Sequence, residues 1–476
     1  MSLRGGTMAD VKSVADGYTF DGIRLEEFQV AGLFGEFDYK IPLNLSTHVT
    51  AIIAPNGTGK TLCLRMIAGL FENKWSVFYE TEFSSATYTF SDGTVATIHK
   101  KSGGYDNNEA EVEAKLQIRI VLPNGEKTEW SPRLFDPKRP IQIERFVPFL
   151  TRIGGGRWRH DHTGEVFGIN ELIENWGDAF PENVRSSLYG KKPSVLTALT
   201  DQIDCRLIET QRLLILRDED QETYYGHSRK PQSTLAITRK ARALKEIISK
   251  EINAYATLSQ SLDRSFPKRV ILRTAMQTPE GLTSQLDELD ARRRELMDAG
   301  ILDTEADDPV SLPEGPLDPA IARVLHVYAD DTKKKLSSLS QLLSKITLFK
   351  TLIDQRFITK DVSISRQHGI DVFSRGANVP LDKLSSGEQH QLVLFFELLF
   401  EIKRNSLILI DEPELSLHVA WQKKFIGDLL SIIELNKFDV ILATHSPQLI
   451  GRWNDLVVEL GDVYEGSYSD DEDGVE

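Results

Sequence analysis

Two short stretches near residue 400 combine residue types that handle phosphate groups. Leu384–Glu388 reads LSSGE, a turn of small residues that opens a long apolar segment. The free backbone N–H groups and the dipole at such a helix start attract an anion. The second stretch, Ser406–Ile410, is a short run of branched apolar residues, typical of a buried parallel strand. Asp411 and Glu412 follow it directly, so we expect Asp411 to hold Mg²⁺ and Glu412 to orient or deprotonate an attacking water.

A phosphate-binding loop lies far upstream of these carboxylates. Residues 54–61 read APNGTGKT, between a short apolar run and the helical stretch Leu62–Phe71. This order of strand, glycine-rich loop and helix is typical of a phosphate loop, although Ala54 replaces the usual first glycine. We expect Lys60 to reach the β- and γ-phosphates of ATP and Thr61 to ligate Mg²⁺. The residues predicted to bind the nucleotide here are Asn56, Gly57, Thr58, Gly59, Lys60 and Thr61.

Two more polar residues follow apolar runs that resemble buried strands. His445 comes directly after Val440–Thr444, and we expect it to contact the γ-phosphate. Gln211 follows Cys205–Thr210, and its amide is the expected third ligand of the magnesium ion; Gln142 is the alternative. Open α/β sheets bind ligands at the carboxyl ends of their strands, so these side chains should meet the two carboxylates there.

Two β-hairpins are predicted between residues 77 and 130. Ala86–Phe90 and Val95–Lys100 are joined across Asp92-Gly93, and Ala114–Leu122 and Lys127–Trp130 are joined across Asn124-Gly125. Asx-Gly turns between alternating runs are strong hairpin signals. They predict an antiparallel β-subdomain beside the main sheet. The strand pair expected in Asp361–Phe373 should return the chain to that main sheet.

Apolar residues recur at helical spacing in residues 233–262, 283–297 and 319–357. We interpret them as a compact helical insertion or a short antiparallel coiled coil. Two polar clusters leave alternatives open. The basic run Arg239, Lys240, Arg242 and Lys245 indicates a solvated helix face or a nucleic-acid contact. Trp158, Arg159, His160 and His162 indicate a solvated loop, or else a contact to metal or nucleic acid. In both clusters we favour the solvated reading.

Composition bounds the class of protein. The chain has 476 residues, 40% hydrophobic and 27% charged, as expected for a globular protein of one large or two ordinary domains. A net charge of −15 argues against a protein that coats nucleic acid. Two cysteines, Cys63 and Cys205, give neither a disulfide framework nor a cysteine metal site. Without a signal peptide or an apolar span of about 18 residues, we expect a cytoplasmic protein with no membrane contact.

Taken together, the motifs APNGTGKT, LSSGE, LILIDEP, SLH and ATHSP occur in an order that resembles ABC-type ATPases of the SMC-like, RecF-like and OLD-like branch. The resemblance implies an α/β fold, with a P-loop ATPase head whose mixed sheet is flanked by helices and joined by the antiparallel β-subdomain. The implied segments are an N-terminal lobe (19–230), the helical or short coiled-coil insertion (231–357), a C-terminal lobe (358–465) and an acidic tail (466–476).

The same resemblance implies a role for each motif. Ser385, Ser386 and Gly387 would form the signature loop that contacts the γ-phosphate held by another protomer. Glu412 would be the catalytic base, His445 the γ-phosphate sensor, and residues 416–418 a loop at the dimer interface. Hydrolysis of ATP to ADP and phosphate would then need a composite site, built in head-to-tail ATP-sandwich dimers with Mg²⁺.

Within this branch the sequence is most similar to the ATPase subunits of bacterial phage-defence systems. AriA-type ATPases of PARIS systems come first and PtuA-type ATPases of Septu systems second. That resemblance implies a sensor and scaffold that assembles into homo-oligomers as large as a hexamer. It would control a separate Toprim-type or HNH-type nuclease, as in a toxin–antitoxin pair, and respond to a phage protein. A RecF/SMC-like DNA-repair ATPase is the alternative, which leaves DNA binding open, while the insertion disfavours a transporter subunit.

Overall fold

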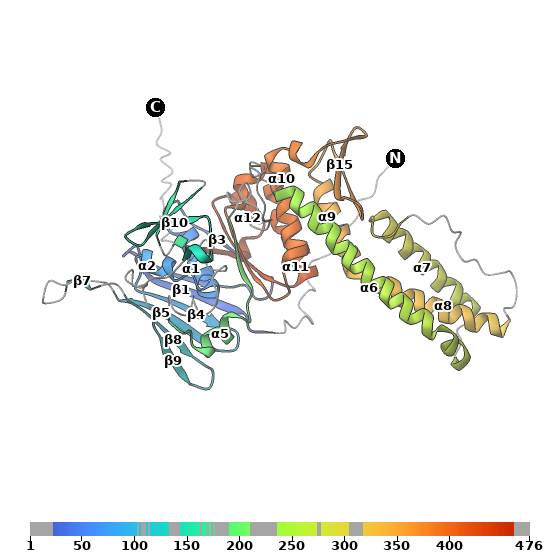
Figure 1. The fold of residues 1–476 in the computed structure, drawn as a ribbon, viewed down its shortest axis with the longest axis horizontal. Helices are drawn as coiled ribbons and strands as arrows, with labels where there is room; N and C mark the ends of the chain where they lie inside the picture. Colours follow the sequence, from blue (N-terminus) through green and yellow to red (C-terminus); the bar gives the residue numbers. More distant parts are fainter. Residues whose placement is uncertain are drawn as a thin grey trace, which may run out of the picture. The chain divides into compact units, whose positions relative to one another are not determined.

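The computed structural model describes residues 22–101, 104–105, 111–112, 115–132, 143–161, 164–168, 171–172, 176, 190–209, 236–273, 278–303 and 318–460. The chain divides into two compact units, coloured along the sequence in Figure 1. Unit 1 combines the residues up to Glu209 with Lys403–Glu414 and the residues from Lys437 on; unit 2 combines Thr210–Ile402 with Leu415–Asn436. The segment predicted as the C-terminal lobe, 358–465, therefore contributes to both units.

A five-stranded sheet, in the order β13-β17-β18-β3-β19, forms the centre of unit 1. Its strands are β3 (Val49–Ile53), β13 (Cys205–Glu209), β17 (Leu407–Asp411), β18 (Asp439–Thr444) and β19 (Val457–Glu459). Every pairing is parallel. The apolar residues of β17 and all residues of β18 are buried, because a parallel sheet is covered on both faces. The carboxyl ends of all five strands consequently share one edge.

The predicted β-subdomain is confirmed as a six-stranded antiparallel sheet, in the order β2-β1-β4-β5-β8-β9. Its strands are β1 (Leu25–Leu33), β2 (Phe37–Pro42), β4 (Ser85–Phe90), β5 (Val95–Lys101), β8 (Lys115–Val121) and β9 (Lys127–Trp130). Helix α1 (Lys60–Glu72) shares one apolar core with the five-stranded and the six-stranded sheet. The buried Tyr88 hydroxyl donates to the Met66 carbonyl at 2.8 Å, which ties this sheet to α1. Helix α1, whose first residue is Lys60, is thereby held in place.

The expected solvated loop around Trp158 is wrong. Strands β10 (Leu150–Gly154), β11 (Arg157–His160) and β12 (Val166–Gly168) form a small antiparallel sheet. Trp158 is fully buried and His160 is nearly so, whereas Arg157 and Arg159 between them are exposed. The residues RWRH thus follow the two-residue alternation of a strand, and the glycines 154–156 form its tight turn with positive φ. His162 lies outside the described residues.

Unit 2 contains the helical insertion, which is confirmed. Its helices are α6 (Ala236–Leu272), α7 (Pro279–Asp298), α8 (Pro319–Ser338) and α9 (Ser340–Asp354). Ion pairs join α6 to α8: Asp263 with Lys335 at 2.8 Å, and Arg269 with Asp331. The partner number on α8 falls as the number on α6 rises, so these two helices are antiparallel. Helix α8 packs against both the long α6 and α7, and these helices can be followed in Figure 1.

Two further expectations about unit 2 need correction. The strands β14 (Asp361–Ser365), β15 (Gly369–Ser374) and β16 (Ala377–Asn378) do not join the parallel sheet but form a sheet of their own. Lys240, expected on a solvated helix face, is buried and pairs with Glu397 at 2.7 Å and with Glu401 at 2.8 Å. A lysine is buried only with such partners, which the spacing within one helix could not indicate.

Helix α10 (Ser386–Phe396) begins at the LSSGE turn and continues as a π-helical turn (Glu397–Glu401). Helix α11 (Val419–Asn436) also belongs to unit 2. The remaining short elements are α2 (Trp75–Glu80), α5 (Ser194–Thr200), α12 (Pro447–Ile450), β6 (Gly104–Tyr105) and β7 (Glu111–Val112). Among the described residues, none of the helices has both the length and the apolar content needed to span a membrane.

Candidate functional site

The phosphate loop runs from the end of β3 to the start of α1. Gly57 and Gly59 have φ angles of 84° and 92°, in the left-handed region that side chains disfavour. A Cβ atom on Gly59 would lie 2.8 Å from the Leu33 side chain, so only glycine fits there. The Tyr39 hydroxyl donates to the Thr58 carbonyl at 2.9 Å and fixes the loop from the neighbouring sheet. The backbone at the start of α1 is therefore shaped before any ligand binds.

Lys60 is the first residue of α1 and is only 5% exposed. Its ammonium donates to the carbonyls of Ala54 at 2.8 Å and Pro55 at 3.0 Å, so it folds back over the loop. Burial lowers the pKa of Lys60, although the carboxylates of Glu412, Asp411 and Glu414 oppose this shift. Neutral carbonyls are weaker partners for an ammonium than phosphate oxygens are. The geometry is thus that of a cation ready to exchange carbonyls for a phosphate.

Thr61 and Asp411 meet at the carboxyl edge of the parallel sheet. The Thr61 hydroxyl lies 2.9 Å and 3.1 Å from the two carboxylate oxygens of Asp411. Hydroxyl and carboxylate oxygens, with room left for phosphate and water, are the donor set that Mg²⁺ prefers. The two residues therefore fit the magnesium role expected of them.

Glu412 follows Asp411 with a φ of 47°, an uncommon backbone conformation for a residue other than glycine. Its backbone N–H donates to the Ala443 carbonyl at 2.9 Å, which holds the strand end in place. The Glu412 carboxylate lies 3.5 Å from Nε2 of His445. Strain of this kind is often kept at functional sites, where it directs a side chain into a pocket.

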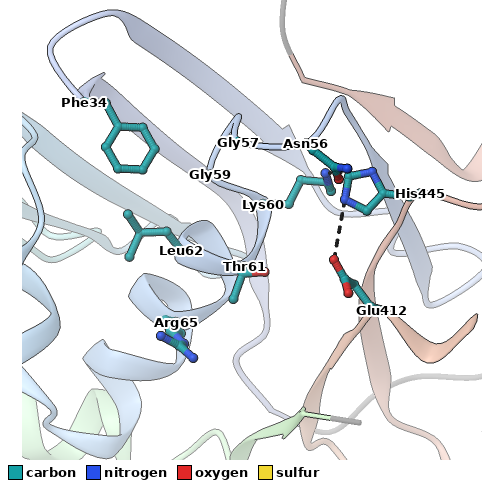
Figure 2. Close-up of a pocket in the computed structure, with 10 residues that line it drawn as sticks. All are labelled: Phe34, Asn56, Gly57, Gly59, Lys60, Thr61, Leu62, Arg65, Glu412 and His445. Carbon is teal, nitrogen blue, oxygen red and sulfur yellow. Dashed lines mark hydrogen bonds and ion pairs between the residues drawn. The ribbon is translucent and has the colours of Figure 1, made fainter. Parts of the chain in front are cut away.

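His445 lies between Lys60 and Glu412 (Figure 2). Its Nδ1 is 3.3 Å from the Lys60 ammonium and its Nε2 faces Glu412. An ammonium can only donate, so Nδ1 must accept and the proton of a neutral ring sits on Nε2. The His445 backbone N–H donates to a Glu414 carboxylate oxygen at 2.6 Å. Glu414, which we did not predict from the sequence, thus holds the histidine in position.

These residues surround one cavity of about 340 Å³. Figure 2 shows the residues that line it: Phe34, Asn56, Gly57, Gly59, Lys60, Thr61, Leu62, Arg65, Glu412 and His445. The structure thus brings together most of the predicted nucleotide-binding residues and both predicted catalytic residues. Thr58 instead directs its hydroxyl to the Pro55 carbonyl, at 2.9 Å. Gln211 and Gln142 both lie outside the described residues.

Phe34 and Arg65 were not predicted from the sequence. Phe34 occupies the turn between β1 and β2 with a φ of 55° and is 43% exposed, an unusual position for a large aromatic residue. Figure 2 shows its ring above Leu62, at the end of the pocket away from Glu412 and His445. A purine ring that extends from the phosphates could stack there. The sequence signal was an aromatic residue in the glycine-flanked turn 32–35.

Phe34→Ala is accordingly expected to raise the Kd for ATP about fivefold, at the low end of the roughly 1–3 kcal/mol that base stacking contributes, because the ring is half exposed. Phe34→Trp should keep tight binding. Titration of both variants with a fluorescent ATP analogue checks this. Equal affinity of Phe34→Ala and the wild type would show that the base binds elsewhere.

The signature turn, formed by the predicted signature-loop residues Ser385, Ser386 and Gly387, lies in unit 2. Ser385 is the N-cap of α10, and its hydroxyl accepts from the Glu388 N–H at 3.4 Å while the Glu388 carboxylate accepts from the Ser385 N–H at 2.8 Å. This is a capping box, which fixes the first turn of a helix. Ser386 and Gly387 are the first two helical residues, so their N–H groups point out of the helix start.

Comparison with known proteins gives the family. The model of the AAA ATPase domain matches residues 34–450. Two molybdenum import ATP-binding proteins, both named ModC, are similar over part of the chain. The protein from Pseudomonas syringae pv. tomato is 28% identical over 153 residues, 32% of this chain and 36% of that protein. The protein from Albidiferax ferrireducens is 30% identical over 152 residues, 31% of this chain and 34% of that protein. The similarity thus spans about a third of these relatives.

Solved SMC head domains show a weak overall likeness. The SMC head domain from Thermotoga maritima has a TM-score of 0.31 at 13% identity, over 92% of this chain and 95% of that chain. The Smc head domain with an extended coiled coil bound to the C-terminal domain of ScpA, derived from Pyrococcus furiosus, has a TM-score of 0.31 at 12% identity, over 92% of this chain and 93% of that chain. Scores this low carry no argument about function. Because the family model covers most of the sequence, the chain belongs to the AAA ATPase domain family.

Proposed function

We propose that this ATPase hydrolyses ATP with Glu412 as the general base. The observation that carries the proposal is the grouping of Lys60, Thr61, Asp411, Glu412 and His445 at one edge of the parallel sheet. Lys60 binds the β- and γ-phosphates, and Thr61 and Asp411 hold Mg²⁺, which would neutralise charge on those phosphates. Glu412 takes a proton from the attacking water, while His445 contacts the γ-phosphate through its Nε2 proton.

We further propose that the site is completed by a second copy of the chain. Each residue that lines the pocket belongs to unit 1, whereas the signature turn belongs to unit 2. In ABC-type ATPases, which the motifs resemble, this turn contacts the nucleotide of the other protomer. That resemblance supports head-to-tail dimers with ATP sandwiched between them, and larger homo-oligomers of such dimers.

A mixing experiment tests the composite site. Lys60→Ala impairs the phosphate loop and Ser385→Arg blocks the signature turn, so each variant alone should turn over little ATP at an ATP concentration that saturates the wild type but not Lys60→Ala. A mixed dimer of the two contains one intact pair, from the loop of one chain and the turn of the other. Partial recovery of phosphate release on mixing is therefore expected. If mixing restores nothing although the two variants form mixed dimers, each chain works with its own signature turn.

For the biological role, we propose a cytoplasmic sensor and scaffold that controls a separate nuclease in anti-phage defence. The support is the resemblance of the LSSGE and LILIDEP segments to defence ATPases, together with a full ATPase motif set. Native mass spectrometry of the protein purified with the product of its neighbouring gene, with and without ATP, tests this role. A complex that contains the neighbour supports it, and an ATP-dependent dimer without the neighbour contradicts it.

The alternative of a DNA-repair ATPase is less well supported. Lys240 cannot contribute to a basic surface on α6, because it is buried and forms internal ion pairs with Glu397 and Glu401. The net charge of −15 also opposes binding to a phosphate backbone. Stimulation of the ATPase by DNA, with binding that weakens as salt rises, would revive this alternative.

A further inference from the structure

The signature turn of this chain contains a carboxylate where the transporter form of the motif, LSGGQ, has a neutral glutamine. That carboxylate, Glu388, is half buried and belongs to the first turn of α10, three residues after the N-cap Ser385. One of its oxygens is 2.8 Å from the Ser385 backbone nitrogen and 2.8 Å from the Ser385 hydroxyl. The residue thus adds a negative charge to a turn that should approach a triphosphate.

Lys360 faces this carboxylate from another element. Its ammonium lies 2.6 Å and 2.8 Å from the two Glu388 oxygens, with side-chain exposures of 20% for the lysine and 13% for the glutamate. The lysine backbone is fixed on both sides: its N–H donates to the Phe357 carbonyl at 3.3 Å, and β14 begins at the next residue. Burial opposes the shift, but hydrogen bonds from Lys360 and Ser385 outweigh it and lower the pKa of Glu388. The pair is therefore a fixed and ionised one.

The position of Glu388 creates an electrostatic problem for ATP. If the Ser385 hydroxyl donates its one proton to a γ-phosphate oxygen, its oxygen lies between that phosphate oxygen and the Glu388 carboxylate, which are then at most about 6 Å apart. Like charges so close lie within the Debye length of about 8 Å at physiological ionic strength and repel each other. A carboxylate without a countercharge would also compete with the phosphate for the Ser385 proton.

We propose that Lys360 is a positioning residue that neutralises Glu388 and so allows the Ser385 turn to accept a triphosphate. Lys360 itself touches no nucleotide and acts through the charge and hydrogen bonding of the turn. The inference rests on the proposed ATP-sandwich dimer. It predicts that loss of Lys360 is harmful only while Glu388 carries its charge.

A double-mutant cycle in a Glu412→Gln parent, which cannot turn ATP over, tests this inference. The quantity measured is the ATP concentration that gives half-maximal dimer by mass photometry. We expect Lys360→Met to raise it about tenfold and Lys360→Met/Glu388→Gln to return within about threefold of the parent, because the second change removes the unpaired charge. The tenfold penalty should shrink as salt is raised. Lys360→Arg should behave as the parent. So should the control Lys334→Met, which replaces an exposed lysine of α8.

Each outcome separates the inference from the proposed function. If the Glu412→Gln parent forms no dimer with ATP, the proposed function itself fails. If the parent dimerises and Lys360→Met equals it, Lys360 has no role in ATP-driven dimerisation. If the double variant stays as weak as Lys360→Met, the lysine only supports the fold and charge compensation is wrong.

Discussion

Glu412→Gln is expected to lower steady-state ATP turnover by roughly 10²–10⁴-fold, the usual contribution of a positioned general base. The glutamine keeps the size of the side chain and its contact with His445 but cannot accept a proton from water. The backbone of residue 412 is held by its hydrogen bond to Ala443, so the substitution should leave the strand end in place. Phosphate release at saturating ATP and Mg²⁺ measures the effect. Glu126→Gln, on the exposed turn between β8 and β9, is the matched control and should leave turnover unchanged.

Because the variant binds ATP without hydrolysing it, it should also accumulate the ATP-bound dimer. Size-exclusion chromatography with light scattering should detect a dimer of Glu412→Gln with ATP and a monomer with ADP. Turnover at the wild-type rate would refute the assignment of Glu412 as the base. Slow turnover without any dimer would keep the base but reject the sandwich arrangement.

The parallel sheet could be predicted from the sequence because its strands are short and consist mainly of apolar residues with branched side chains. Ile410 and Thr444 end such runs, and a polar residue follows each one, so the run itself marks where Asp411 and His445 emerge. The phosphate loop could be predicted for a similar reason, since Gly57 and Gly59 are needed where φ is positive. These signals depend only on neighbouring residues, so they can be recognised in a single sequence.

The residues that were missed depend on contacts between distant segments. Phe34 lies at the nucleotide pocket only because the β1–β2 turn packs against Gly59, 25 positions further along the chain. Lys240 can be buried because it forms ion pairs with Glu397 and Glu401, which lie on another helix. Glu388 pairs with Lys360, the residue that precedes β14. Neither helical spacing nor composition contains information about such pairings.

Lys60→Ala is expected to weaken ATP binding about 10–100-fold, because a charge-assisted hydrogen bond contributes about 1.5–3 kcal/mol and about 1.4 kcal/mol corresponds to a factor of ten. The ammonium is the cation of the pocket that reaches over the loop carbonyls, and α1 can still present its backbone N–H groups to a phosphate. Binding should therefore be reduced rather than abolished. Isothermal titration of ATP with Mg²⁺ measures the change.

The same variant should not destabilise the protein without nucleotide. The pKa of Lys60 is lowered by burial, which means that the folded protein disfavours the charged form relative to water. Its removal takes away that unfavourable burial together with two hydrogen bonds to carbonyls, so the melting temperature without ATP should change little. ATP should then raise the melting temperature of the wild type more than that of Lys60→Ala at equal ligand concentration. A large drop in melting temperature without ATP would instead assign Lys60 a structural role, and Lys60→Arg, which keeps the charge, would show whether charge alone restores the loop.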